Sequence, residues 1–234
     1  ALPFLSGLGA QRLAAQPGRR LLVGTYRPED LTSRRPFPAA LARLERRHEV
    51  TRLLLERFGE SETAALLAEV TGRRVSYRTV AELHQRTGGN PFFLEELLRE
   101  YGSDDLDALV DQPLPWSLAE IFRRQIDDLA PSHRAIVEAA AVLGQRVEFD
   151  LLAEVTGATE DELIAALRAL VENRVLVETG EDEFGFRHAL LREAVSAQLL
   201  GRQRRRLHEA ALEALREAGG SDPAMIAHHA QAAG

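Results

Sequence analysis

The stretch TEDELIAALRALVENRVLVETGEDEFGFRHALLREAV, residues 159–195, contains a helix pattern, a hairpin pattern and a second helix pattern in direct succession. Thr159 followed by Glu162 forms a capping box, and the apolar residues after it recur as they do in an amphipathic helix. The run VLVETGEDEFGFRH then changes to a strand pattern around a polar turn at 180–183, which is typical of a β-hairpin. ALLREAV begins the next helix. This stretch therefore predicts helix, hairpin and helix.

Three further helices are expected just before this stretch. SLAEIFRRQIDDLA and PSHRAIVEAAAVLG are two helical patterns divided by Pro131, and FDLLAEVTG is a short third helix. Helices followed by a hairpin are the layout of a winged-helix domain, which we expect over residues 113–200. Two more helical patterns, RQRRRLHEAALEALREAGG and DPAMIAHHAQAAG, fill residues 201–234 and are interpreted as the start of a helical, TPR-like region.

A small helical domain is expected over residues 59–112. Ser61 is the predicted N-cap of the helix ETAALLAEVTG, and YRTVAELHQRTGG is a second helix. The stretch RTGGNPFFLEELLRE, residues 86–100, joins this helix to a third through a turn. In that turn Asn90 suits the N-cap and Pro91 the first helical position. Residues 103–115, rich in Asp and Pro, are expected to form a linker.

Residues 1–58 have the pattern of the C-terminal part of an αβ domain. The apolar run from Leu21 to Thr25 suits a buried parallel strand, 36–49 suits a helix, and VTRLLLERF, residues 50–58, suits a second strand. Two strands cannot bury a sheet by themselves. Because the sequence also begins mid-pattern, without methionine, we expect it to be a fragment of a longer chain.

The composition excludes several classes of site. A formal net charge of -7 argues against general binding to nucleic acid. The absence of cysteine excludes a disulfide framework and a thiolate metal site. All 29 Lys and Arg residues are arginine, which excludes a phosphate loop of the G-x-x-x-x-G-K-[ST] type and a Schiff-base lysine within this sequence. No apolar run approaches the roughly 18 residues of a membrane span, so we expect no membrane partner and a cytoplasmic protein.

Four segments, in this order, resemble the STAND class of P-loop ATPases found in large LuxR-family transcriptional regulators. LLVGTYRPEDL resembles the sensor-1 strand, VTRLLLERFGESETAALLAEVTG the last core strand and the start of the helical lid, RTGGNPFFLEELLRE the GxP motif of the lid, and FGFRHALLREAV the end of the winged-helix domain. The resemblance implies a mainly α fold with a small α/β remnant: part of a P-loop NTPase sheet, a helical lid, a winged-helix domain and the start of a helical repeat.

The resemblance also implies three residues that contact ATP or ADP. Arg27 would face the terminal phosphate, which a guanidinium can bind through two hydrogen bonds. Pro91 would pack on the adenine, and His188 would reach the β-phosphate of ADP, although Ala189 replaces the acidic residue that follows the histidine in that motif. Each residue also has an ordinary explanation: a surface arginine before a turn, a proline that opens a helix, and a histidine that caps one.

In the family, nucleotide exchange works as a switch. The resemblance implies that the intact protein binds ADP in a closed state, and ATP, with Mg, in an open state that self-associates. An unknown signal ligand or protein would bind the C-terminal region, and DNA would be bound only through a domain outside this sequence. The Walker motifs would precede Ala1. We therefore predict no catalytic residue in this sequence, and no ATP hydrolysis by this part alone.

The alternative is a winged-helix DNA-binding or adaptor protein without nucleotide binding. The candidate recognition helix carries Glu160, Asp161, Glu162 and Glu172 against Arg168, and the wing tip reads GEDE. These surfaces would repel phosphates, which disfavours this alternative. The basic run GRQRRRLHEA is open to two interpretations: a contact with nucleic acid or an acidic partner, and, preferred here, a solvated helix face. The adjacent histidines 228 and 229 do not share a helix face, so no metal site is predicted.

Overall fold

The computed structural model describes residues 23–25, 42–43, 46, 51–219 and 222–234. By their internal contacts the residues form two units, 1–55 and 56–234, and each is described by itself. In the described part of the first unit, Ala42, Arg43 and Arg46 are helical, in agreement with the helix expected over 36–49. Arg27, the predicted phosphate contact, lies outside the described residues.

Neither strand expected in residues 1–58 is present among the described residues. Residues 23–25 and 51–59 have no regular secondary structure, and Leu53, Leu54 and Leu55 are 81%, 69% and 88% exposed. A strand is stable only when its backbone groups pair with a neighbouring strand. No described strand pairs with this segment, so the prediction of a strand over 50–58 is wrong for the residues that the structure describes.

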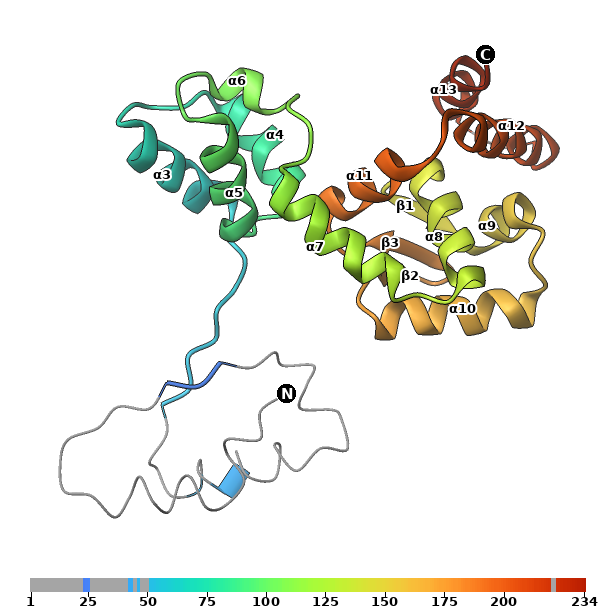
Figure 1. The fold of residues 1–234 in the computed structure, drawn as a ribbon, viewed down its shortest axis with the longest axis horizontal. Helices are drawn as coiled ribbons and strands as arrows, with labels where there is room; N and C mark the ends of the chain where they lie inside the picture. The colour runs from blue at the N-terminus through green and yellow to red at the C-terminus, as the bar shows by residue number, and fades with distance from the viewer. Residues whose placement is uncertain (1–22, 26–41, 44–45, 47–50, 220–221) are drawn as a thin grey trace. The chain divides into compact units, whose positions relative to one another are not determined.

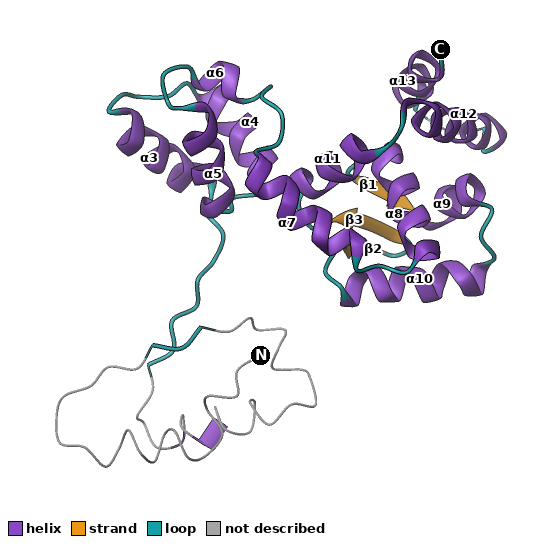
Figure 2. Cartoon of the chain, viewed as in Figure 1, coloured by secondary structure: helices purple, strands orange, loops and turns teal. Residues whose placement is uncertain are grey.

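The second unit is mainly helical and contains one small antiparallel sheet, which confirms the predicted helical fold class in its coarse form (Figures 1 and 2). We call α3 to α6 the helical segment and α7 to α11, with the strands, the sheet segment. The helices of the helical segment are α3 (Glu60–Thr71), α4 (Tyr77–Thr87), α5 (Pro91–Tyr101) and α6 (Leu106–Leu109). Those of the sheet segment are α7 (Trp116–Asp127), α8 (Pro131–Leu143), α9 (Phe149–Thr156), α10 (Glu160–Glu172) and α11 (Ala189–Gln198). The chain continues with α12 (Gly201–Glu217) and α13 (Pro223–Ala233).

The sheet consists of β1 (Arg146–Glu148), β2 (Leu176–Gly180) and β3 (Glu183–Phe186), in the order β1-β3-β2. The β2–β3 hairpin turns through Glu181 and Asp182, which confirms the predicted turn, and Asp182 has the left-handed φ of 60° that tight hairpin turns use. Strand β1 was not predicted, because three residues are too few for alternation to be recognised. It pairs with β3 and so joins the residues before α9 to the hairpin.

Two apolar clusters hold the second unit together. One fills the helical segment and contains leucines of α3, α4, α5 and α6, with Leu67 and Leu83 fully buried. The other fills the sheet segment and reaches α12 through Ala211. Phe93 lies on α5 but belongs to the second cluster, where it packs edge-on against Phe122 at a ring-centroid distance of 5.5 Å. The helical segment therefore inserts an aromatic side chain into the core of the sheet segment.

The helix starts confirm two predicted caps and correct a third. The capping box of Thr159 and Glu162 is present, and Asn90 Oδ1 accepts a hydrogen bond from the Phe92 amide at 3.1 Å. Ser61 was predicted to cap α3, but this helix begins two residues earlier, with Gly59 as the N-cap. The reason is the Glu62 carboxylate, which accepts a hydrogen bond from the Gly59 amide at 2.7 Å and so satisfies a free donor at that end.

The predicted linker over 103–115 contains the short helix α6, whose first turn is capped by Asp105. None of the described helices combines the length and the apolar composition needed to cross a lipid bilayer.

Candidate functional site

The turn between α4 and α5 is built from two glycines in the left-handed region. Gly88 has φ 60° and Gly89 has φ 67°, a conformation that strongly favours glycine. The carbonyl of Gly89 accepts a hydrogen bond from the Phe58 amide at 2.8 Å. A Cβ at Gly89 would lie 2.2 Å from the Phe58 carbonyl oxygen, so the missing side chain is what allows the two backbones to meet. The turn therefore serves as a docking point for residues 57–58 as well as a hinge between helices.

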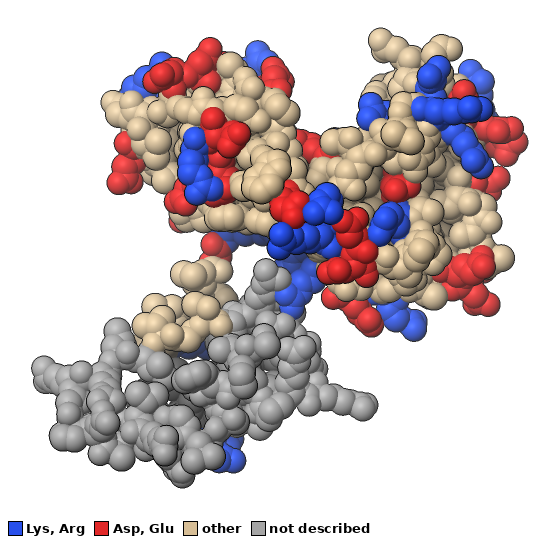
Figure 3. Space-filling model, in the orientation of Figure 1, with Lys and Arg blue, Asp and Glu red and all other residues tan. Residues whose placement is uncertain are grey.

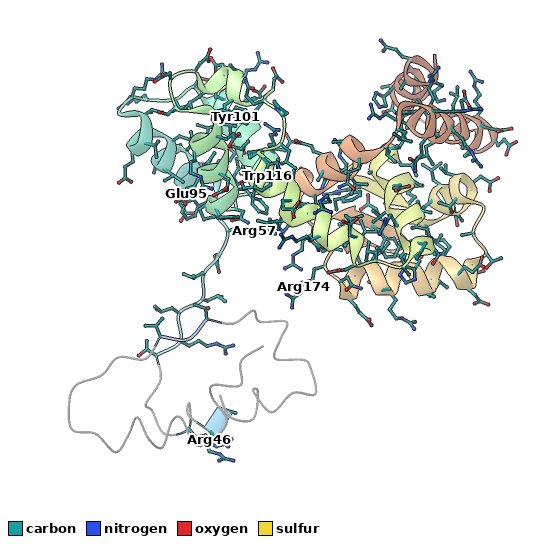
Figure 4. The ribbon with its side chains drawn as sticks, viewed as in Figure 1. Arg46, Arg57, Glu95, Tyr101, Trp116 and Arg174 are labelled. Carbon is teal, nitrogen blue, oxygen red and sulfur yellow. The ribbon has the colours of Figure 1, made fainter. Side chains whose placement is uncertain are left out.

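Arg57 joins this turn to the start of α11 (Figure 4). Its Nη1 donates to the Gly88 carbonyl at 2.9 Å, and its Nη2 lies 3.3 Å from Nδ1 of His188, a residue 131 positions away in the sequence. Because a guanidinium can only donate, Nδ1 of His188 must be the acceptor. The ring is then neutral, with its proton on Nε2. One arginine thus connects the helical segment to the sheet segment.

The environment of Arg57 is electropositive. Burial lowers the pKa of Arg57, and the neighbouring charge of Arg187 lowers it further. The side chain as a whole remains exposed, so Arg57 stays protonated and keeps donors near the surface. A cation that is partly desolvated beside another cation is stabilised by an anion. Exposed guanidinium donors of this kind suit an anionic group.

His188 is held between β3 and α11. It is the N-cap residue of α11, but its side chain makes no capping hydrogen bond, so the simple capping explanation does not account for it. Its ring packs edge-on against Phe93, with ring centroids 5.0 Å apart and planes at 88°. Since Phe93 lies two positions after Pro91 on α5, this contact brings the helix that Pro91 begins next to His188.

A second arginine links the same two segments. Arg86 forms a two-pronged ion pair with Glu193 on α11, from Nε to Oε1 at 3.0 Å and from Nη2 to Oε2 at 2.8 Å. It also donates to the carbonyls of Leu109, Val110 and Gln112 at 3.1, 3.0 and 2.6 Å. Only 10% of its side chain is exposed. This arginine is a buried structural contact that fixes α4, the linker and α11 together.

Of the three residues that the resemblance implied, the structure brings the Pro91 turn and His188 to one place, while Arg27 lies outside the described residues. Arg57, Phe93, Arg86 and Glu193 were not predicted. No local signal distinguishes Arg57 among 29 basic residues, all of them arginine. Phe93 carried a weak signal, because the pair FF directly follows the turn.

Acidic and basic side chains are both spread over the face of the second unit shown in Figure 3. The wing of the sheet segment is acidic. A shallow depression of about 290 Å³ there is lined by Glu148, Phe149, Asp150, Glu181, Asp182 and Glu183. Another, of about 320 Å³, lies on the helical segment among Ser76, Arg78, Glu82, Asp107, Val110 and Asp111, away from the Arg57–His188 contact. Within the described part of the chain, no group of three or more His, Asp or Glu residues is arranged to hold a metal ion.

No protein-family model matches the chain. An uncharacterized protein of Rhizobium meliloti (strain 1021) is 28% identical over 92% of this chain, and the match covers 21% of that protein. The chain thus spans about a fifth of the length of the curated relative it matches.

Proposed function

We propose that this chain is the C-terminal part of the ATP/ADP-binding switch module of a STAND signal-transduction ATPase. The observation that carries the proposal is the Arg57 bridge: Arg57 contacts both the Gly88 carbonyl and His188, which lies 131 positions after it in the sequence. The two segments that the family resemblance assigns to adenine and phosphate contact are thereby neighbours in space.

The element order supports the same proposal. The sequence α8, β1, α9, α10, β2, β3, with strand order β1-β3-β2, is the arrangement that a winged-helix domain requires. The helical segment before it takes the place of the lid, and the helix pair α12 and α13 the start of a TPR-like sensor region. We infer the domain limits 59–112, 113–200 and 201–234 from this order, with 1–58 belonging to the αβ nucleotide-binding domain.

The chemistry of the junction suits a nucleotide. The two left-handed glycines let a ligand approach the backbone without meeting a side chain. Pro91, fixed at the start of α5, offers a flat apolar surface to a base. Arg57 and the Nε2–H of a neutral His188 are donors suited to phosphate oxygens. In the intact protein a phosphate loop and Mg, outside these residues, would complete the site.

As a switch, the proposal needs two states that bind nucleotide differently. ADP would favour the closed state, in which the lid and winged helix are held together as they are here. ATP would favour an open state that self-associates. A signal acting on the C-terminal helices would shift the balance. We propose a cytoplasmic LuxR-type transcriptional regulator that binds DNA through another domain.

Direct DNA binding by the sheet segment is disfavoured. The wing and the start of α10 carry Glu181, Asp182, Glu183, Glu160 and Asp161, which would meet phosphates with like charge. Gel-shift binding of this chain to duplex DNA at physiological salt would support the DNA-binding alternative against the switch.

The proposal is tested by ADP affinity in the intact protein, measured by calorimetry. Pro91→Ala and His188→Ala should each weaken ADP binding by about tenfold, which corresponds to the loss of one good contact. The matched controls are Pro131→Ala, which removes the same first-turn proline from α8, and His133→Ala on that helix. Controls that weaken ADP binding as much as the site variants would contradict the proposal, as would micromolar ATP binding by this chain alone.

A further inference from the structure

The contact between α12 and α13 closes over two histidines. His208 on α12 is 6% exposed and His229 on α13 is fully buried. Their Nδ1 atoms are 2.8 Å apart, and their ring centroids 5.0 Å apart. The two helices lie side by side at the C-terminal end of the ribbon (Figure 1). A buried imidazole pair is therefore a direct link between these helices.

The geometry decides which nitrogens carry the protons. Two Nδ1 atoms at hydrogen-bond distance require that one carries hydrogen and the other a lone pair. Nε2 of His229 is buried and has no hydrogen-bond partner among the described residues. An unpaired buried donor is costly, and a bare lone pair is the milder state. His229 therefore carries its proton on Nδ1 and donates it to His208, whose own proton is on Nε2.

A third proton does not fit this arrangement. On Nε2 of His229 it would form a buried cation without an acceptor, and on Nδ1 of His208 it would place two donors face to face. Burial, together with the nearby His208 and His228, lowers the pKa of His229 to about 4. Burial, His228 and Arg204 lower the pKa of His208.

The groups that act on this pair are all basic. His228 acts on it from α13 and Arg204 from α12. Helices α8 and α9 also pack on α12, and the Glu138 carboxylate of α8 accepts a hydrogen bond from Gln203 of α12. Among the described residues, no carboxylate is a cause of the pKa shift of either histidine.

We propose that the pair of His208 and His229 is a pH-sensitive clasp, which holds α13 against α12 while both rings are neutral and releases α13 when a proton enters. A released histidine titrates near its ordinary pKa of about 6.5. The released state therefore binds more protons than the docked state at any pH between about 6.5 and 4, so docking is strongest above this window and weakens as the pH falls through it. The clasp does not depend on the proposed nucleotide site.

The test uses hydrogen exchange of the full chain, expressed as protection factors for residues 223–233 at pH 7.5 and pH 5. For His229 alone, the two pKa values predict that protection falls by roughly 30-fold. The control is His133→Gln, since His133 lies on α8 and outside the pair. This variant should show the same fall in protection between the two pH values. Protection that is the same at both pH values in the wild type would overturn the proposal.

A double variant separates the clasp from simple packing. His208→Leu with His229→Phe replaces both rings by apolar groups, and should keep α13 protected at pH 7.5 and remove the dependence on pH. A double variant that stays protected but keeps the 30-fold fall would overturn the clasp. If α13 is unprotected in the double variant at every pH, nitrogen NMR of the wild-type imidazoles decides. The clasp is supported if Nδ1 of His229 carries the proton and if the rings titrate at the pH at which α13 loses its protection. It is overturned if the proton of His229 is on Nε2, or if the rings titrate while α13 stays protected.

Discussion

Two arginines join the helical segment to the sheet segment, and they do so in different ways. Arg86 is 10% exposed, forms a two-pronged ion pair with Glu193 and donates to backbone carbonyls in the linker. Arg57 is exposed and makes two contacts, one with the Gly88 carbonyl and one with Nδ1 of His188. The same residue type thus connects the same two segments once as a buried anchor and once as a surface bridge.

This difference in burial indicates which arginine contributes to stability and which can take part in a switch. A buried arginine with all its donors used can leave its place only at a large cost, because its partners would be left unpaired. An exposed arginine loses little when a contact breaks, because water replaces it. In the proposed switch, Arg86 would keep the segments together, while Arg57 could exchange its contacts for those of a phosphate.

The largest effect is expected for Arg86→Gln. Glutamine is too short to reach Glu193 and the carbonyls of the linker, so these groups lose their donor. The free energy of unfolding should fall by about 3 kcal/mol, as measured by urea denaturation.

Arg78→Gln is the matched control for Arg86→Gln, because its ion pair with Glu82 is solvent-exposed and should contribute little to the free energy of unfolding. Equal losses in the two variants would remove the distinction between a buried anchor and a surface pair.

The next effect concerns the turn that Arg57 contacts. Gly89→Ala places a methyl group against the Phe58 carbonyl in a left-handed backbone, and should destabilise the chain by about 2 kcal/mol. Gly72→Ala is the control, because Gly72 has the same φ of 67° but open space around it. The control should cost about 1 kcal/mol.

The difference in the free energy of unfolding between Gly89→Ala and Gly72→Ala measures only the contribution of residues 57–58 packed against the turn. If both alanines cost the same in thermal unfolding, the close approach of Phe58 to the turn contributes nothing to stability.

Local rules were sufficient to predict most helices. The capping box at Thr159, the N-cap Asn90 and the hairpin turn depend on residues at most a few positions apart, and all three are confirmed. Where two local signals competed, the sequence was misleading. Ser61 is a good capping residue, but the Glu62 carboxylate reaches back to Gly59 and sets the helix start there.

Strand predictions failed where a partner was needed. The run at 50–58 has the apolar character of a strand, but the described residues contain no strand that pairs with it. By contrast, β3 is confirmed because β2 lies two residues away and supplies its hydrogen bonds. An apolar pattern predicts a tendency to form a strand, but the strand forms only where a neighbouring strand can pair with it.

The candidate site was only partly accessible from sequence. Pro91 and His188 were selected because their surroundings resemble family motifs, and the structure brings the two regions together. Arg57 could not be selected, since its role depends on a contact 131 residues away. The pair of His208 and His229 was not predicted either, because its two rings are 21 positions apart and meet only when α13 packs on α12.

The smallest effect on stability is expected for Arg57→Gln, together with a clear local change at His188. Two exposed hydrogen bonds are lost, so the free energy of unfolding should change by less than about 1 kcal/mol. The Nδ1 nitrogen of His188, however, loses its donor, and its nitrogen NMR shift should move toward that of an unbonded lone pair. Arg78→Gln should leave this signal unchanged.

A loss of stability as large as that of Arg86→Gln would show that Arg57 is a second anchor, whose contacts a nucleotide could replace only at a large cost in free energy. An unchanged His188 signal would show that the bridge does not persist in solution, and would remove the observation on which the proposed function depends.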